Sequence, residues 1–105
     1  MTAKEFDNFE RALVKAVNAS RQFEDSEDGG TCNFDTPVIR IKATAKQMYS
    51  LDWHAEKIGG RTWRGYWFLF VPLAGQANRR TRMAEAVAQS LAADGYDACV
   101  YYQVD

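Results

Sequence analysis

Three arginines at the start of an expected helix are the residues whose spacing best suits chemistry. They follow the apolar run 66–71 and a short loop. Cations there face the positive end of the helix dipole, where acidic residues are normally favoured. Guanidinium groups are forked donors that match phosphate and carboxylate oxygens, so the pattern predicts a site for an anion or a partner. The predicted binding residues are Gln76, Asn78, Arg79, Arg80 and Arg82.

A structural role for the same arginines is the alternative. The loop before them has neither the GxxxxGK[ST] pattern of a phosphate-binding loop nor the GxGxxG dinucleotide pattern. In the alternative, the arginines pair with the acidic residues 24, 25, 27 and 28 or face water. Replacing Arg79 and Arg80 separates the two roles. The free protein keeps its stability if they serve binding, and it melts at a lower temperature if they are structural.

A long loop over residues 24–36 is the second candidate site. Loops of this length without secondary structure are often functional. A reactive thiol would need a neighbouring base, and nothing in the sequence places the single histidine, His54, near Cys32. The segment therefore predicts an interaction loop anchored by Phe34 rather than a catalytic pair. The predicted loop residues are Cys32, Asn33, Phe34 and Asp35.

The third candidate is a surface that mixes bases with aromatic rings. Arg61, Trp63 and Arg64 precede Tyr66 and Trp67, a composition suited to stacking on single-stranded nucleic acid. Aromatic residues of a small domain also form its core, and Tyr66 and Trp67 are expected there. The predicted surface is therefore limited to Arg61, Trp63 and Arg64.

Metal, cofactor and catalytic sites are not indicated. The two cysteines, Cys32 and Cys99, have no CxxC spacing, and one histidine with two distant cysteines gives no metal site. Both cysteines are expected to be reduced and not bonded to each other, with Cys99 in a buried strand. We predict no cofactor and no catalytic residue. A small enzyme acting on an anionic substrate stays open as an alternative.

Composition and charge indicate one soluble domain spanning residues 1–105. Six Phe, five Tyr and three Trp are enough for a core. The formal net charge of -1 gives no overall bias toward nucleic acid or membrane, although segment 36–82 carries nine basic and two acidic groups between acidic ends. No apolar run approaches the roughly 20 residues that span a bilayer. The sequence predicts a cytoplasmic protein without membrane contact.

Hydrophobic periodicity predicts three helices and three or four strands. A capping box at Thr2 starts a helix over 3–23, and a second one at Thr44 starts another helix. Strands are expected over 38–42, near a sheet edge, and over 66–71 and 98–104. A third helix over 78–94 ends at Gly95. Residues 53–58 either continue the second helix or form a strand that turns back at 59–60, with the strand slightly preferred.

These elements predict an α/β or α+β domain with three helices packed on a mixed sheet. The last three form a strand–helix–strand crossover, which places strands 66–71 and 98–104 parallel, either adjacent or one apart. Every residue of 66–71 is apolar, so this strand is expected in the interior of the sheet with both faces covered. Phe68→Asp is then expected to abolish soluble expression, because it buries an uncompensated charge.

Three segments give the chain a family resemblance. Segments 29–35 and 75–86, together with the ending 101–105, resemble a group of small uncharacterised bacterial proteins carried on plasmids, conjugative elements and prophages. The resemblance implies an accessory or host-interaction role, including antagonism of host defence, and assigns no activity to any residue.

Three functions remain as hypotheses. The first is a non-enzymatic accessory protein that contacts a macromolecular partner, expected to be a protein, through the 29–36 loop and the helix start at 78–82. The second is a nucleic-acid-binding accessory protein that uses the basic segment 36–82. The third is the small enzyme. Salt-dependent retention on a heparin column favours the second over the first.

Overall fold

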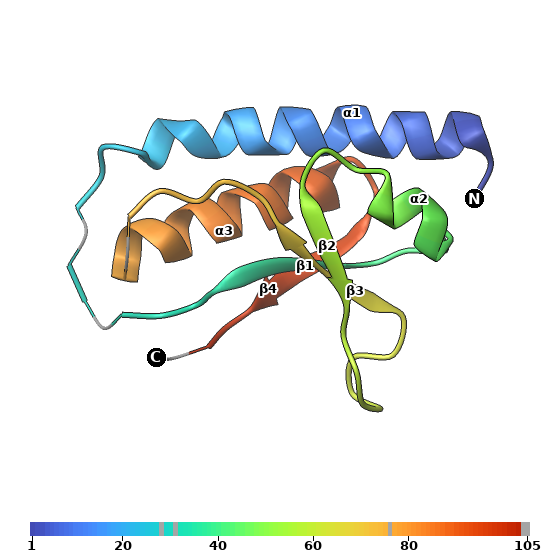
Figure 1. Ribbon diagram of the computed structural model, residues 1–105. Helices are drawn as coiled ribbons and strands as arrows, with labels where there is room; N and C mark the ends of the chain where they lie inside the picture. The colour runs from blue at the N-terminus through green and yellow to red at the C-terminus, as the bar shows by residue number, and fades with distance from the viewer. Residues whose placement is uncertain (28, 31, 76, 104–105) are drawn as a thin grey trace.

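The computed structural model describes residues 1–27, 29–30, 32–75 and 77–103 of the chain. These residues form three α-helices, one short 3₁₀ turn and four strands. Figure 1 shows how the helices and strands are arranged. In chain order they are α1 (Ala3–Ser20), η1 (Arg21–Phe23), β1 (Thr36–Arg40), α2 (Ala45–Tyr49), β2 (His54–Lys57), β3 (Tyr66–Phe70), α3 (Ala77–Ala93) and β4 (Asp97–Tyr101). The prediction of one small domain with three helices on a sheet is confirmed as an α+β fold.

The four strands form one sheet in the order β2-β3-β1-β4. Each neighbouring pair is antiparallel, so the predicted mixed sheet is wrong. Strands β3 and β4 run parallel to each other with β1 between them, which is the predicted crossover with its strands one apart. Strand β1 was expected near an edge, but it lies in the interior because β3 and β4 pair with its two sides.

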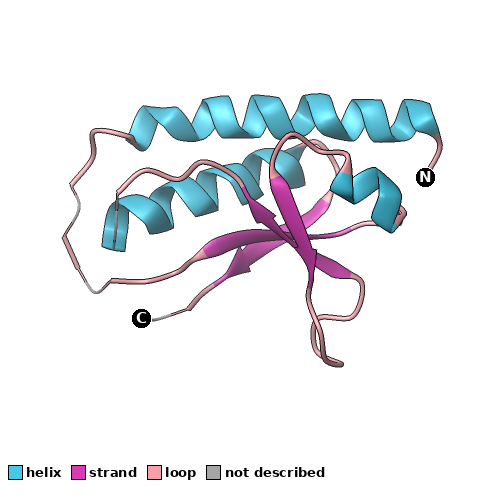
Figure 2. Cartoon of the chain, viewed as in Figure 1, coloured by secondary structure: helices cyan, strands magenta, loops and turns pink. Residues whose placement is uncertain are grey.

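From β1 onward the chain follows a β-α-β-β-α-β sequence, the split β-α-β arrangement. Helix α2 has only five residues, and α1 lies beside α3 on the same side of the sheet (Figure 2). The other side of the sheet carries no helix among the described residues (Figure 2). On the side without helices, the β3 side chains are only partly buried, whereas Val38 of β1, in register with Phe68, is buried.

Local signals define the starts of α1 and α2 and the end of α3 as predicted, whereas α1 ends at Ser20 and the predicted last turn, residues 21–23, is a 3₁₀ turn. The Thr2 hydroxyl accepts from the Glu5 N–H at 3.1 Å, and the Glu5 carboxylate accepts from the Thr2 N–H at 2.8 Å. Thr44 and Gln47 form the same reciprocal pair at the start of α2. Gly95 follows α3 with φ +92°, a conformation that glycine adopts without strain.

The hydrophobic core lies between the two long helices and one face of the sheet. The apolar stripe of α1, which includes Phe9 and Leu13, is buried there. Ile39, Trp67 and Leu69 supply the sheet side of the core. Each buried aliphatic or aromatic side chain of this kind contributes about 1.5–3 kcal/mol relative to an exposed one.

Strand β3 is paired on both sides, as predicted, but only one of its faces is covered. Trp67 and Leu69 point into the core and are 4% and 1% exposed. Tyr66 and Phe68 are half-buried on the other face, and Phe70 is 39% exposed. The expectation that both faces are covered, and that Tyr66 belongs to the core, is therefore wrong. The preferred reading of residues 53–58, a short helix followed by a strand, is confirmed.

Candidate functional site

The arginine-led start of α3 and the loop before β1 lie together. The Asn78 N–H donates to the Gly29 carbonyl at 3.0 Å. The Arg79 Nε–H donates to the Ser26 carbonyl at 2.8 Å, and the Arg80 Nε–H donates to the Asp35 carbonyl at 3.0 Å. The sequence placed binding residues in both segments, and the fold does bring the two segments into contact.

Asp35 is the centre of this contact. Asp35 is 5% exposed, and its carboxylate accepts from the Thr81 hydroxyl at 2.7 Å and from the Gln103 N–H at 2.8 Å. The Asn33 amide donates to the Ala77 carbonyl and to Thr81, while its carbonyl accepts from the Asp35 N–H. We call Asn33, Asp35, Arg79, Arg80 and Thr81 the loop–helix clasp. A buried carboxylate with two donors stabilises the fold, because its loss would leave those donors without a partner.

The clasp favours the structural role for two of the three arginines. Their Nε–H groups donate to backbone carbonyls, and Nη2 of Arg80 also donates to the Thr36 hydroxyl at 3.4 Å. No described ion pair joins Arg79, Arg80 or Arg82 to the acids at 24, 25 and 27. Burial lowers the pKa of the Arg80 guanidinium, and the neighbouring Asp35 partly offsets this effect. Arg82 is exposed, and Gln76 lies outside the described residues. Anion binding by this group stays a prediction.

The double variant Arg79→Ser/Arg80→Ser is expected to lower the melting temperature. Hydrogen bonds from charged groups contribute about 1.5–3 kcal/mol each when they are well formed, and partial exposure reduces that figure here. Arg82→Ser is the matched control, since it removes an exposed guanidinium from the same helix turn. Thermal unfolding followed by circular dichroism measures both. A double variant that melts with the wild type would show that the clasp contacts are not structural.

The uncovered side of the sheet carries a continuous group of rings, which we call the aromatic face. They come from β2, from β3 and the hairpin before it, and from β4. The residues of the aromatic face are His54, Trp63, Tyr66, Phe68, Phe70 and Tyr101. The strand register brings these residues together. Phe70 lies opposite His54, and Val38 of β1 lies between Phe68 of β3 and Cys99 of β4.

Neighbouring rings of the aromatic face contact each other in an unbroken chain. Centroid separations from His54 through Phe70, Phe68, Tyr101 and Trp63 to Tyr66 lie between 5.1 and 5.6 Å. These distances fall in the range of favourable ring pairs, which contribute about 0.5–1.5 kcal/mol each beyond area burial. These ring contacts hold the aromatic face in position. The side chain of His54 is 67% exposed at one end of the chain of rings.

An arginine and a carboxylate fix the other end of the aromatic face. The Arg40 guanidinium donates to Asp97 at 2.8 Å and lies 5.5 Å from the centre of the Tyr66 ring. The Tyr66 hydroxyl donates to the same carboxylate at 3.2 Å. Burial and Asp97 raise the pKa of Tyr66, so this hydroxyl keeps its proton at neutral pH. Gly65 has φ +81°, and a Cβ there would approach the Arg40 side chain to 3.4 Å.

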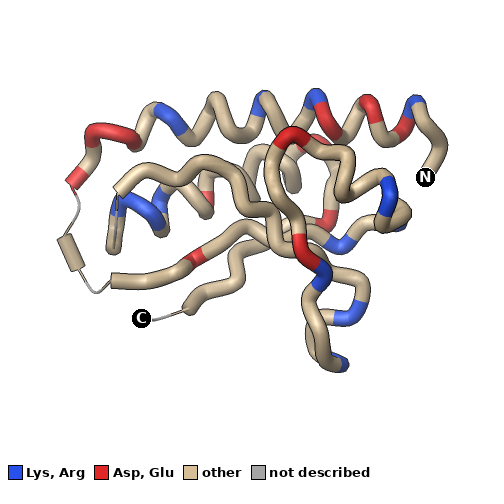
Figure 3. Tube along the Cα trace, viewed as in Figure 1, with Lys and Arg blue, Asp and Glu red and all other residues tan. Residues whose placement is uncertain are grey.

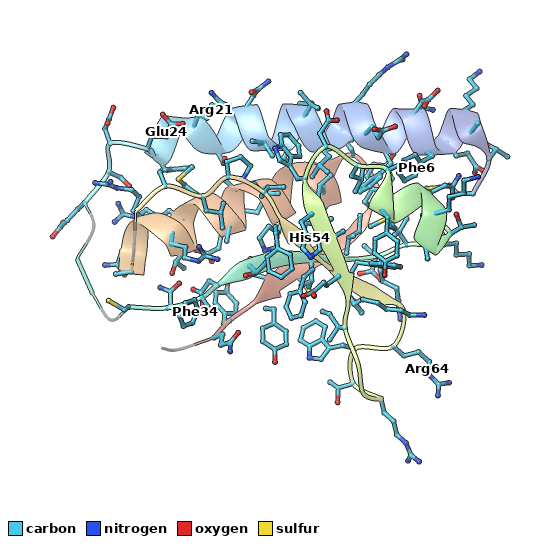
Figure 4. The ribbon with its side chains drawn as sticks, in the orientation of Figure 1. Phe6, Arg21, Glu24, Phe34, His54 and Arg64 are labelled. Carbon is cyan, nitrogen blue, oxygen red and sulfur yellow. The ribbon has the colours of Figure 1, made fainter. Side chains whose placement is uncertain are left out.

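A basic hairpin adjoins the aromatic face. The turn between β2 and β3 carries Arg61 and Arg64, both exposed, and Lys57 lies at its base. Figure 3 shows these cations at the end of the molecule away from the acidic residues that follow η1. In Figure 4, Arg64 extends outward from the hairpin, while His54 lies over the sheet. Trp63, predicted with Arg61 and Arg64, packs on Tyr66 and Tyr101 between the hairpin and the sheet.

Sequence reasoning found the hairpin and missed most of the aromatic face. The missed residues are Tyr66, Phe68, Phe70, Tyr101 and His54. A signal was present in segment 66–71, where Tyr, Phe and Phe alternate with Trp, Leu and Val. With the period of two of a strand, the first set shares one face and the second set the other.

The remaining reactive groups do not form a site of their own. Cys32 and Cys99 are not joined in a disulfide, as predicted, and Cys32 is exposed. Cys99 lies half-buried on the aromatic side, opposite Val38, rather than in the core, and burial raises its pKa. No cluster of three or more metal-ligating side chains occurs within the described ranges. No helix in that part of the chain is long and apolar enough to cross a membrane.

Comparison with protein-family models, with curated proteins and with solved structures gave no match to the chain.

Proposed function

We propose that this protein binds single-stranded nucleic acid on its aromatic face. The observation that carries the proposal is the unbroken chain of rings on the uncovered side of a four-stranded antiparallel sheet. Unpaired bases stack on such rings because every base has a π face, and each stacked base contributes about 1–3 kcal/mol. Duplex bases are already stacked on each other, so a single strand is the better ligand.

The arrangement is similar to that of RNA-recognition modules. These use a four-stranded sheet whose central strands present aromatic side chains to two or three bases. Their third strand follows the pattern K/R-G-F/Y-G/A-F-V-x-F/Y. This chain agrees with it at Arg64, Gly65, Tyr66 and Phe68. It departs at positions 67, 69 and 71, where Trp, Leu and Val are buried, so the open side keeps its rings.

The basic hairpin supplies the sequence-independent part of the interaction. Cations that neutralise backbone phosphates release counterions, which makes affinity fall with salt. Arg61 and Arg64 are exposed beside the aromatic face, whereas Arg40 is occupied by Asp97. The proposed path of a strand therefore starts at the hairpin and crosses the sheet from Trp63 toward Phe70. A cytoplasmic location and carriage on a mobile element remain predictions.

Fluorescence anisotropy tests the proposal directly. Labelled single-stranded RNA, single-stranded DNA and a duplex of the same sequence are titrated with the protein at low salt. We expect saturable binding of a single strand and weaker binding of the duplex. The comparison of RNA with DNA identifies which single strand the protein prefers. Absence of binding to both single strands at low salt would overturn the proposal.

The double variant Arg61→Ser/Arg64→Ser is expected to reduce the salt dependence of binding. Each phosphate contact to a single strand contributes about -0.7 to the slope of log K against log salt, so two lost contacts reduce its magnitude by up to about 1.4. The control is Arg11→Ser/Arg21→Ser, which removes two exposed arginines from α1 and η1. In Figure 4, Arg21 lies on the helix side, away from the sheet. Equal slopes for the two double variants would exclude the hairpin from the interface.

A protein partner at the loop–helix clasp is the second candidate function. The observation in its favour is the exposure of Phe34, which is 51% accessible beside exposed Cys32. An apolar ring held at this exposure next to a rigid clasp suits a protein contact. Phe34→Ala leaves nucleic-acid affinity unchanged if this surface serves a different partner.

A further inference from the structure

The two edges of the sheet are protected to different degrees. Unpaired strand edges invite pairing with another chain, and proteins usually protect them with charges, proline or short length. Strand β2 has four residues, with Glu56 and Lys57 exposed on it. The middle of β4 is Ala98-Cys99-Val100, without charge or proline. Within the described residues, no strand pairs with the outer side of β4.

The pairing of β4 with β1 determines which backbone N–H and C=O groups of β4 point away from the sheet. The Phe34 N–H donates to the Gln103 carbonyl at 2.7 Å, in the same register as the pair Val38 and Cys99. Hydrogen-bonded pairs alternate with non-bonded pairs along an antiparallel ladder, so Cys99 turns its backbone groups toward β1. Val100 therefore directs its N–H and C=O away from the sheet.

An apolar groove runs beside this edge. It lies between α3 and β4 with a volume of about 250 Å³. Small side chains line it, with Ala88 and Ala92 on the helix and Ala98 and Val100 on the strand. Alternate side chains of a strand added to β4 would point into this groove, which is the usual geometry of strand addition.

The acidic residues around the edge are partnered within the chain. Asp97 pairs with Arg40 at 2.8 Å, and Asp94 pairs with Lys15 at 3.1 Å. Glu85, in the groove, accepts from the Tyr102 hydroxyl at 2.8 Å. The described residues from 83 onward contain acidic groups but no basic ones. Because the acids named above have partners within their own chain, a second copy of the same edge does not bring unpaired like charges together.

We propose that β4 pairs antiparallel with β4 of a second copy of this chain, with Val100 on the two-fold axis. The Val100 N–H of each copy donates to the Val100 carbonyl of the other. A symmetric contact of this kind closes on itself, and the charged β2 edge does not extend it into a fibre. The two sheets become one sheet of eight strands with both aromatic faces on the same side. The pairing does not depend on nucleic-acid binding, although it would double the surface proposed for it.

Sedimentation equilibrium from micromolar to near-millimolar concentration tests the pairing. We expect a mass approaching twice the 11.9 kDa of the chain at high concentration. Val100→Pro removes the outward N–H while the ladder with β1 keeps its donors, so this variant should stay folded and monomeric. A wild-type protein of single-chain mass throughout, or a dimeric Val100→Pro variant, would overturn the proposal.

A charge at the axis gives a second, independent test. Val100→Lys places two like charges opposite each other in the dimer. In the monomer, a lysine at this half-buried position beside the groove can extend its ammonium group into water. This variant should sediment as a monomer. Val14→Lys is the matched control, because Val14 is 46% exposed on α1, and it should remain dimeric. A dimeric Val100→Lys variant would place the contact elsewhere and contradict the pairing.

Discussion

Phe68→Ala should weaken binding of single-stranded nucleic acid by about 5-fold to 150-fold, because one stacked base contributes about 1–3 kcal/mol. Phe68 lies in the middle of the chain of rings, in contact with Phe70 and Tyr101, so no neighbouring ring replaces it. Anisotropy titrations at one fixed salt concentration measure the effect.

The control for this variant is Tyr49→Ala. Tyr49 is 64% exposed, and it lies on α2, where its ring contacts that of the core residue Trp67. It should bind with wild-type affinity. If Phe68→Ala and Tyr49→Ala bind equally well, the ligand does not stack on the aromatic face.

Leu69→Asp should abolish soluble expression, whereas Phe68→Asp should give soluble protein. Leu69 is 1% exposed in the core, where truncation of a leucine alone costs about 2–5 kcal/mol. A buried charge without a partner adds several kcal/mol, so the total approaches the entire stability of a small domain, about 5–15 kcal/mol. The side chain at 68 is half-buried on the open side, where water solvates a carboxylate.

Soluble yield and thermal unfolding of the two aspartate variants check this contrast. It replaces the expectation from the sequence, which assigned the severe effect to Phe68. Loss of soluble protein in both variants would mean that a second layer covers the aromatic face. That result would also remove the surface on which the proposed function depends.

The features that sequence reasoning predicted correctly depend on short-range contacts. The two capping boxes join residues three apart, and the stripe of α1 repeats every three or four residues. Gly95 ends α3 through a backbone conformation that other residues adopt at a cost. Interactions of this range are visible in the order of residues, because no distant segment is needed to form them.

The aromatic face was missed because burial depends on how many helices cover the sheet. A run such as Tyr66–Phe70, apolar at each position, fits a strand covered on both sides. The second helix, however, has only five residues and does not cover the second side. Hydrophobicity alone does not separate Leu69 in the core from Phe68 in the open.

The arginine-led helix shows the opposite difficulty. From the sequence, the expected structural partners of the arginines were acidic side chains, because these can be identified by residue type. The Nε–H groups of Arg79 and Arg80 instead donate to the backbone carbonyls of residues 26 and 35, which lie 53 and 45 positions away in the sequence. Every residue has a backbone carbonyl, so residue types do not show which carbonyl accepts a given hydrogen bond. A cation that breaks a local helix rule therefore indicates either a ligand or a distant loop.

Nuclear magnetic resonance of the isotope-labelled protein, titrated with a short single-stranded oligonucleotide, tests the central claim most directly. The account predicts shifts for the amides of Tyr66, Phe68, Phe70 and Tyr101 and for the indole of Trp63. It predicts no change along α1. Shifts confined to the 29–36 loop and the start of α3, or no shifts at all, would contradict it.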